Sequence, residues 1–205
     1  MALTFTQVRV ILRSRLDESS ASMWTEAELQ DHLFIAENEV LGLLPADALW
    51  DIQQVEAQVE SSANDLYVTL PDTAAMLKPL RVDLKYDTAA YKRTRIVPPN
   101  RASEYAASTT NPVVWFEDGK AYYSPQDDET KTNTLKFYYI QQPTEGSVLV
   151  PDRYISLVID LAYAYAIARE DPALGLQEKQ LFYQRMGLIN EQYSGRFNLG
   201  PDRSL

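Results

Sequence analysis

The chain has 205 residues, 45% of them hydrophobic, and its 19 basic against 29 acidic side chains give a formal net charge of −10. This length and composition suffice for one sizeable core, with room for a small second subdomain. The negative charge argues against a broad grip on nucleic acid, which needs clustered Lys and Arg, and the absence of cysteine excludes disulfides, thiolate zinc sites and cysteine nucleophiles.

The N-terminal segment predicts two antiparallel helices. The apolar residues of the first recur at helical spacing: Phe5, Val8, Leu12 and Leu16. The second begins at Thr25, which forms a capping box with Glu28, and Trp24 and Leu29 occupy the flanking staple positions. Its buried stripe is expected to contain Leu29, Leu33, Ala36, Val40 and Leu44. A polar loop over 15–20 joins the two helices, and 46–50 predicts a short turn that places Trp50 against them.

Acidic residues concentrate in the first part of the chain. Residues 1–62 hold three Arg or Lys against eleven Asp or Glu, so most of the excess negative charge belongs to the helical hairpin and its exit. Such a face can be an ordinary solvated surface, a site for a basic partner, or a wall that repels a passing polyanion. These three interpretations stay open at the level of sequence.

From Gln54 the apolar period changes from helical to alternating, which predicts a β-rich region. The expected strands cover 55–60, 66–70, 82–86, 113–116, 120–123 and 134–140, with a turn over 61–65 and a tight hairpin at Asp118-Gly119. Residues 93–109 and 124–133 are expected to be exposed loops. The basic cluster Lys92, Arg93, Arg95 and Arg101 is either a contact for phosphate or an acidic partner, or a charged strand edge that discourages aggregation.

The C-terminal part returns to a helical pattern. Pro151 opens a helix to Ala168, and Glu170-Asp171-Pro172 separates it from a last helix that ends near Tyr193 with Gly195 at the C′ position. The run Tyr154–Ala168 is interrupted by Asp160 and is shorter than the roughly 20 residues of a membrane span. We expect no membrane segment.

The predicted fold class is α+β. N- and C-terminal helices, residues 1–52 and 151–195, form an antiparallel bundle. Residues 53–150 form an inserted antiparallel β-rich subdomain, and residues 196–205 form an extended C-terminal tail that either frays or lies along a neighbour.

Few residues suggest catalysis. His32 is the only histidine and lies within an acidic helix, where a surface or packing role is the ordinary one. The acidic runs 127–129 and 170–171 show no sign of the fixed cleft that glycoside hydrolysis needs, and no glycine-rich phosphate loop occurs. We expect no catalytic residue, metal ligand or cofactor. The tyrosine pairs 122–123 and 138–139 suit sheet packing, or in principle a sugar-binding platform.

Several segments together resemble head-to-tail adaptor proteins of tailed bacteriophages over about residues 9–170. The resemblance rests on the order of Arg15-Leu16-Asp17-Glu18, Trp24-Thr25-Glu26-Ala27-Glu28-Leu29, the 36–40 helix, Leu66-Tyr67-Val68-Thr69-Leu70-Pro71, Phe137-Tyr138-Tyr139 and the 151–168 helix. It implies a non-enzymatic virion protein, assembled in the host cytoplasm, that forms a ring of commonly twelve copies at the head-to-tail junction. Its implied partners are the portal above and a tail, nozzle or stopper protein below, with DNA passing through the channel without specific binding.

The resemblance and the position of two segments give candidate interaction residues. Portal docking by the tail would involve Arg196, Phe197, Leu199, Arg203 and Leu205. Candidates for the channel wall are acidic residues off the apolar stripe of the second helix: Glu26, Asp31, Glu37 and Glu39. The alternative function is a carbohydrate-binding or glycoside-hydrolysing virion component, in which the aromatic hairpin and carboxylates form a cleft.

Overall fold

The structure is a computed structural model, and it describes residues 3–17, 23–49, 52, 55–61, 65, 67–70, 76–86, 89–125, 132–144 and 146–197. Helices and largely antiparallel strands segregate along the chain, which confirms the α+β class. The chain divides into two compact units. The helical unit comprises Met1–Gln53 and Pro143–Leu205, and the β unit comprises Gln54–Gln142. Residues 143–150 therefore group with the helices, whereas the sequence pattern assigned them to the insertion.

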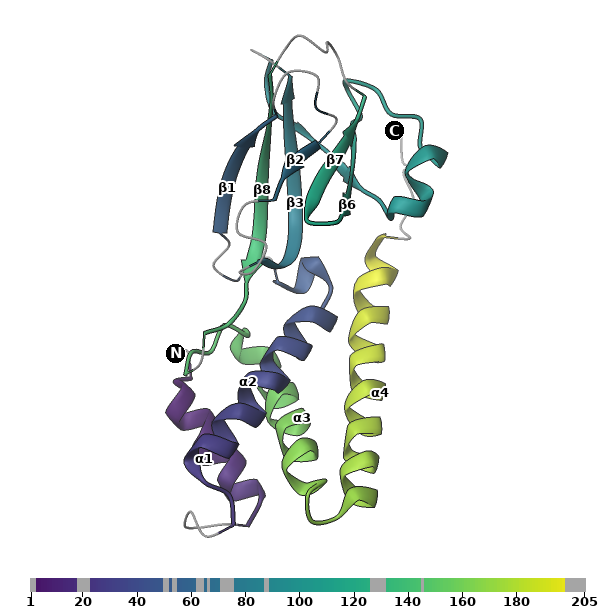
Figure 1. Cartoon of the computed structure of the whole chain (residues 1–205). Helices are drawn as coiled ribbons and strands as arrows, with labels where there is room; N and C mark the ends of the chain where they lie inside the picture. The colour runs from purple at the N-terminus through teal and green to yellow at the C-terminus, as the bar shows by residue number, and fades with distance from the viewer. Residues whose placement is uncertain are drawn as a thin grey trace, which may run out of the picture. The chain divides into compact units, whose positions relative to one another are not determined.

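In its described residues the helical unit contains four α-helices, which Figure 1 labels. These are α1 (Phe5–Arg15), α2 (Glu26–Leu43), α3 (Ile155–Ile167) and α4 (Pro172–Phe197), with short 3-10 turns η1 (Ala46–Leu49) and η3 (Asp152–Tyr154). Helix α3 contacts each of the other three helices. The two ends of the chain therefore build one helical unit around α3.

Side-chain caps define where the first two helices begin. Thr4 and Gln7 form a capping box at α1, and Thr25 and Glu28 form the predicted box at α2. In both boxes the threonine hydroxyl accepts from the backbone N–H three residues on, while the longer side chain accepts from the threonine N–H. The apolar stripe predicted for α2 is buried throughout, from Leu29 to Leu44, and so is Trp24.

Helix α3 is the most deeply buried helix of the unit, because apolar residues cover most of its circumference. At its end the chain turns into α4, where Pro172 occupies the first position and Asp171 Oδ1 accepts from the N–H groups of Ala173 and Leu174. Gly175 sits where a Cβ atom would lie 2.5 Å from that of Ala168. The absent side chain lets α4 approach α3 closely.

The end of α4 differs from the prediction. The helix continues to Phe197, so Gly195 lies within it and is not a C′ residue, and Arg196 and Phe197 belong to the helix rather than to an extended tail. Glycine permits the left-handed cap conformation without requiring it, and each further helical residue gains a backbone hydrogen bond. Trp50 and residues 198–205 lie outside the described residues.

The described strands of the β unit form two four-stranded sheets. One sheet has the order β1 (Val55–Glu60), β8 (Asn133–Gln141), β3 (Met76–Tyr86) and β4 (Lys92–Arg93); the other has the order β2 (Tyr67–Thr69), β7 (Lys120–Ser124), β6 (Val113–Glu117) and β5 (Arg95–Ile96). The predicted hairpin joins β6 to β7, with positive φ angles of 48° at Asp118 and 72° at Gly119. Only the short β5–β6 pair is parallel among the described strand pairs.

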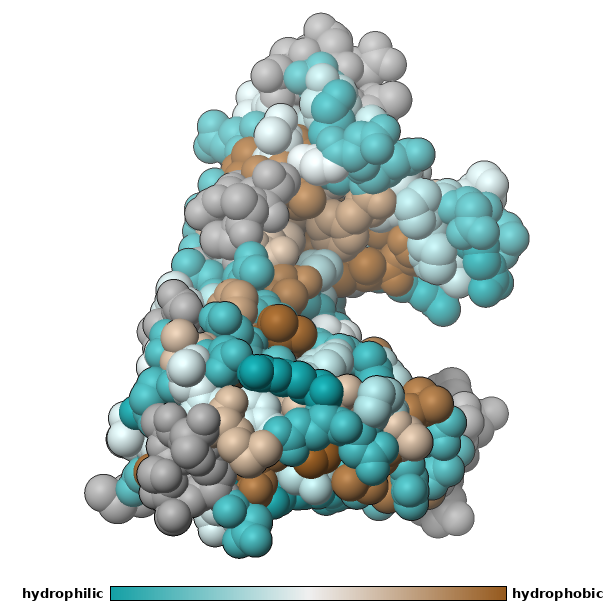
Figure 2. Space-filling view, turned by 60° about the horizontal axis from the view of Figure 1, so that its bottom comes forward, coloured by the Kyte–Doolittle hydropathy of each residue, from teal (hydrophilic) through white to brown (hydrophobic). Residues whose placement is uncertain are grey.

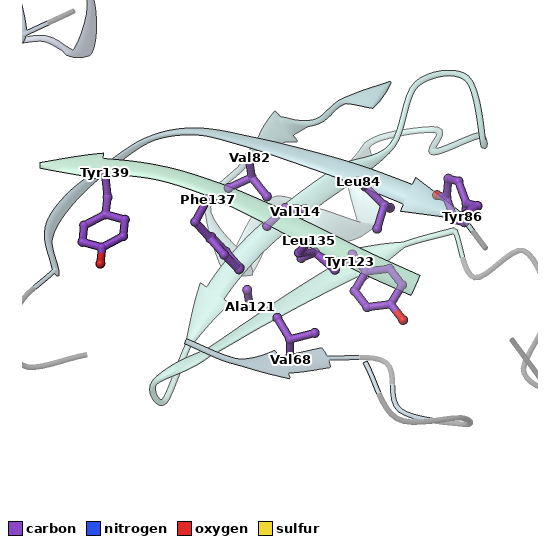
Figure 3. Packing of buried hydrophobic residues seen from close by; sticks show 10 residues of the cluster. All are labelled: Val68, Val82, Leu84, Tyr86, Val114, Ala121, Tyr123, Leu135, Phe137 and Tyr139. Carbon is purple, nitrogen blue, oxygen red and sulfur yellow. The ribbon is translucent and has the colours of Figure 1, made fainter. Parts of the chain in front are cut away.

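The two sheets pack face to face over one apolar cluster (Figure 3). The β1-β8-β3-β4 sheet contributes alternate residues such as Val82, Leu84, Leu135 and Phe137, and the β2-β7-β6-β5 sheet contributes Val68, Val114, Ala121 and Tyr123. The buried Tyr123 hydroxyl donates to Asp65 O and accepts from Asn133 Nδ2. Alternation along each strand therefore leaves one face of each sheet outward.

Several details of the β region were not predicted. Strand β3 begins at Met76 rather than at Val82, and its register with β8 shifts on either side of Pro79, where an irregularity accommodates the missing N–H. Strands β1 and β2 belong to different sheets. The expected loop 93–109 contains β5 and the 3-10 helix η2 (Pro99–Glu104). Propensity alone does not reveal which strands pair.

Candidate functional site

The outward surface of the helical unit is the candidate site for partner proteins, and its charges are largely engaged within the chain. Arg9 and Arg13, one turn apart on α1, both pair with Glu26, at N···O distances of 2.6 and 2.7 Å. Arg169 pairs with Glu28 at 2.8 Å. The acidity of the first hairpin is thus partly neutralised by nearby arginines.

Glu39 also has partners within the unit. Its carboxylate accepts hydrogen bonds from the hydroxyls of Tyr165 on α3 and Tyr183 on α4. The hydrogen bond from Tyr183 to Glu39 is the main reason that the pKa of Tyr183 rises to about 12, and burial adds to it. For Tyr165 burial is the main reason that the pKa rises, and its hydrogen bond to Glu39 adds to it. Glu39 therefore ties α2 to α3 and α4, and both tyrosines stay protonated as donors at neutral pH.

Glu37, one of the channel-wall candidates, is buried, although its position off the apolar stripe predicted that it would face solvent. The residue is 3% exposed, and Oε1 accepts from the backbone N–H groups of Leu149 and Val150. Burial raises the pKa of this carboxyl, against the lowering effect of the two hydrogen bonds. Glu37 thereby holds the segment before η3 against α2. The helical pattern places it beside the stripe, and only its tertiary partner explains its burial.

Asp31 and Glu26 are both exposed, but Glu26 pairs with two arginines, and the partly buried Glu39 accepts from two tyrosines. His32, the neighbour of Asp31, is half-buried, and loss of solvation lowers the pKa of that imidazole. The histidine is therefore neutral at pH 7, in keeping with a packing role.

The predicted tail residues are only partly described. Arg196 and Phe197 form the last residues of α4, while Leu199, Arg203 and Leu205 lie outside the described residues. The acidic run 127–129 also lies outside them. In the described part of the chain, no three His, Asp or Glu side chains gather as a metal site would require. No helix there combines the length and apolar character of a membrane-crossing segment.

Large apolar side chains reach the surface of three helices in the helical unit. On α4, Leu176 and Leu188 are each 60% exposed and Leu181 is 45% exposed. The apolar side chains of Phe182 and Met186 on the same helix are buried. Further exposed apolar residues are Val10 and Ile11 on α1, Ile35 and Leu43 on α2, and Tyr183 on α4. Brown hydrophobic residues likewise interrupt a mainly hydrophilic surface in the space-filling view (Figure 2).

A hollow on this unit adjoins the exposed leucines of α4. Leu181, Phe182 and Leu188 line it together with an ionic cluster in which Asp160 pairs with both Arg15 and Arg185. Arg15 also approaches Glu178 at 3.3 Å and lies 4.6 Å from the ring centre of Tyr163. Exposed leucine side chains therefore lie beside ion-paired charged residues. Protein-docking surfaces commonly combine these two kinds of residue.

The predicted basic cluster is divided between the edges of the two sheets. Arg93 on β4 stands opposite Asp83, Arg95 on β5 lies over the Tyr105 ring, and Arg101 pairs with Glu104 at 2.8 Å. Strands β4 and β5 are edge strands of their sheets. This arrangement favours the interpretation as charged strand edges over one phosphate site.

Comparison with known proteins gives a family match. A protein-family model described as SU10 adaptor protein matches residues 3–204, which covers both units and almost the whole chain. No curated protein matches the chain.

The buried carboxyl of Glu37 predicts a specific pH dependence. Because its pKa is raised above the usual 4.5, the stability linked to its protonation is fully present below pH 4.5 and is lost as the pH rises through the native pKa. The side chain introduced by Glu37→Gln cannot ionise, so the melting temperature of this variant minus that of the wild type should increase from pH 4.5 upward and then level off. Thermal melts across pH 4 to 8 measure this difference.

Glu28→Gln is the control of opposite sign. Hydrogen bonds from Thr25 lower the pKa of Glu28, so its charged form stabilises the fold and that stability is lost as the pH falls through the native pKa. The melting temperature of Glu28→Gln minus that of the wild type should become more negative as the pH rises toward 4.5. A flat or falling difference for Glu37→Gln above pH 4.5 would contradict the role assigned to Glu37.

Proposed function

The chain belongs to the SU10 adaptor protein family, a family of structural phage proteins, and from this premise we propose that it is a head-to-tail adaptor whose copies form a ring under the portal. The proposed ring contains twelve copies, encloses the DNA channel and connects the portal to a downstream tail, nozzle or stopper protein. The helical unit forms the body of the ring, and the β unit is an inserted module. No step of this function requires catalysis.

The observation that carries the ring proposal is the exposed apolar surface on two different parts of the helical unit. Leu176, Leu181 and Leu188 lie on α4, while Val10, Ile11 and Ile35 lie on α1 and α2. A ring made by rotation needs two distinct patches on each copy, because one patch of each subunit meets the other patch of its neighbour. Burying a leucine side chain contributes about 1.5–3 kcal/mol, so the α4 residues can stabilise such a contact appreciably.

Charge substitution on α4 tests the ring contact. The double variant Leu181→Glu and Leu188→Glu should lose assembly, since each contact would lose roughly 3 kcal/mol or more and gain buried charge. Analytical ultracentrifugation and electron microscopy, with and without portal rings, measure assembly. Gln177→Glu adds a charge to an exposed position of the same helix and should assemble normally. Assembly of the double variant at wild-type concentrations would refute this interface.

The proposed portal contact is the C-terminal tail, with Arg196, Phe197, Leu199, Arg203 and Leu205 as docking residues. The first two of these residues end the 26-residue helix α4. Ordering a peptide costs roughly 1–2 kcal/mol per residue in backbone entropy, which requires an extensive contact in return.

Removal of residues 198–205 should abolish binding to portal rings in a pull-down while leaving the melting temperature of the chain unchanged. The unchanged melting temperature is the control for an intact fold. Wild-type recovery of the truncated chain on portal rings would exclude the tail as the docking segment.

The proposed channel wall is acidic, because a wall of like charge lets DNA pass without counterion-release affinity. Asp31 is the strongest candidate, since it is exposed while Glu26 and Glu39 have partners within the chain. Asp31→Lys should slow DNA ejection, and more so at low salt, where charges are less screened. Glu60→Lys, at an exposed position on the edge strand β1 of the β unit, is the matched charge control. Equal ejection rates for Asp31→Lys and wild type at low salt would exclude Asp31 from the channel wall.

A further inference from the structure

Three aromatic side chains form a row across the outward face of the β2-β7-β6-β5 sheet. Tyr67 on β2 pairs with Tyr122 on β7, which in turn pairs with Trp115 on β6. The ring centres of Tyr67 and Tyr122 are 5.5 Å apart, and those of Tyr122 and Trp115 are 5.7 Å apart with nearly parallel planes. All three side chains are partly exposed. The row is thus continuous over three adjacent strands.

This aromatic row is not part of the core of the sandwich. Strand β7 alternates, so Ala121 and Tyr123 are buried between the sheets, whereas Lys120, Tyr122 and Ser124 lie on the other face. Exposed aromatic side chains retain apolar area that solvent does not favour. A contiguous exposed set of them is typical of an interaction site.

The outward face of the other sheet has a different composition and serves as a comparison within the same unit. There Lys136 pairs with Glu56 at 2.6 Å, Arg81 pairs with Asp83 at 2.6 Å, and both cations lie beside the Tyr138 ring. Its charges therefore satisfy one another, and one of them, Asp83, is itself buried. Ion pairs of this kind do not account for the aromatic row on the first sheet.

A hollow adjoins the Trp115 end of the row. Its lining combines the rings of Trp115, Tyr105 and Pro99 with the hydroxyl-bearing Ser103 and Ser124. The residues come from η2, the segment that follows it, and strands β6 and β7. Apolar rings beside hydroxyl groups suit a ligand that itself has one apolar face and a polar rim.

Cationic side chains mark the two ends of the surface. Arg95 lies 4.5 Å from the ring centre of Tyr105 beside the hollow, and Lys120 lies 4.0 Å from that of Tyr67 at the far end of the row. A guanidinium stacked on an aromatic ring keeps its N–H edge available for a carboxylate. The charge of the surface therefore complements an anionic group at either end.

We propose that this face of the β unit is a binding site for an acidic oligosaccharide, with one sugar in the hollow against Trp115, further sugars along Tyr122 and Tyr67, and a sugar carboxylate at Arg95. Sugar rings present apolar C–H groups to aromatic side chains and hydroxyls to polar groups at the rim. Glu117 and Asp118, in the hairpin next to Lys120, disfavour a polyanion such as DNA more than a ligand with isolated carboxylates. This site does not depend on ring formation.

Binding of the full chain to an array of uronate-containing, sialate-containing and neutral oligosaccharides, with single-stranded oligothymidylate alongside, tests the proposal. Acidic oligosaccharides should bind better than neutral ones and better than oligothymidylate. Failure of every acidic oligosaccharide to bind would overturn the proposal. Preferential binding of oligothymidylate would overturn it in favour of a nucleic-acid surface.

Single-residue variants test whether the acidic oligosaccharide binds at the aromatic row. Trp115→Ala and, as a second variant in case the first does not fold, Tyr122→Ala should each weaken binding of the acidic oligosaccharide about tenfold or more. Arg95→Gln should reduce the preference for acidic over neutral sugars. Tyr138→Ala removes a tyrosine from the outward face of the other sheet and should bind as the wild type does. Equal loss in Tyr138→Ala, or wild-type binding by both aromatic-row variants, would place the sugar elsewhere and contradict the site.

Discussion

Burial of α3 is the interaction on which the helical unit depends. Its residues from Ile155 to Ala166 are largely inaccessible to solvent, and it contacts α1, α2 and α4. The chain leaves the helical unit after Gln53 and returns at Pro143, so α3 must join helices that are far apart in sequence. The buried Glu37 carboxylate holds the returning segment through Leu149 and Val150, directly before η3 and α3. The hydrogen bonds to the Glu37 carboxylate thus help to position α3, the most apolar helix of the unit.

The same packing determines which side chains of the helical unit stay available for contacts with partner proteins. Glu26 is neutralised by two arginines, Glu39 accepts from two tyrosines, and Asp160 pairs with Arg15 and Arg185. Exposed ion pairs contribute little to association, because water and salt already screen them. The exposed leucines of α4, by contrast, are not buried against other residues of their own chain. In the proposed adaptor ring, apolar contacts between helices would therefore hold neighbouring copies together.

Local chemistry made much of the fold predictable from sequence. The Thr25–Glu28 box, the alternation of β1 and the Asp118-Gly119 hairpin all appear where the pattern indicated, because capping, pleating and positive φ angles are short-range constraints. The burial of Glu37 against Leu149 and the pairing of Tyr67 with Tyr122 depend instead on residues far apart in the sequence, which no local pattern contains. The exposure of Leu181 escaped prediction for a related reason: helical period identifies an apolar face, but not whether that face meets its own chain or another.

The central claim is that helix-to-helix contacts between copies form a ring beneath the portal. Cryo-electron microscopy of the full chain mixed with purified portal rings tests it most directly. The account predicts a closed ring coaxial with the portal, in which Leu181 and Leu188 of each copy contact α1 or α2 of the next copy. A ring in which these leucines face solvent, or portal rings with no added density, would contradict it.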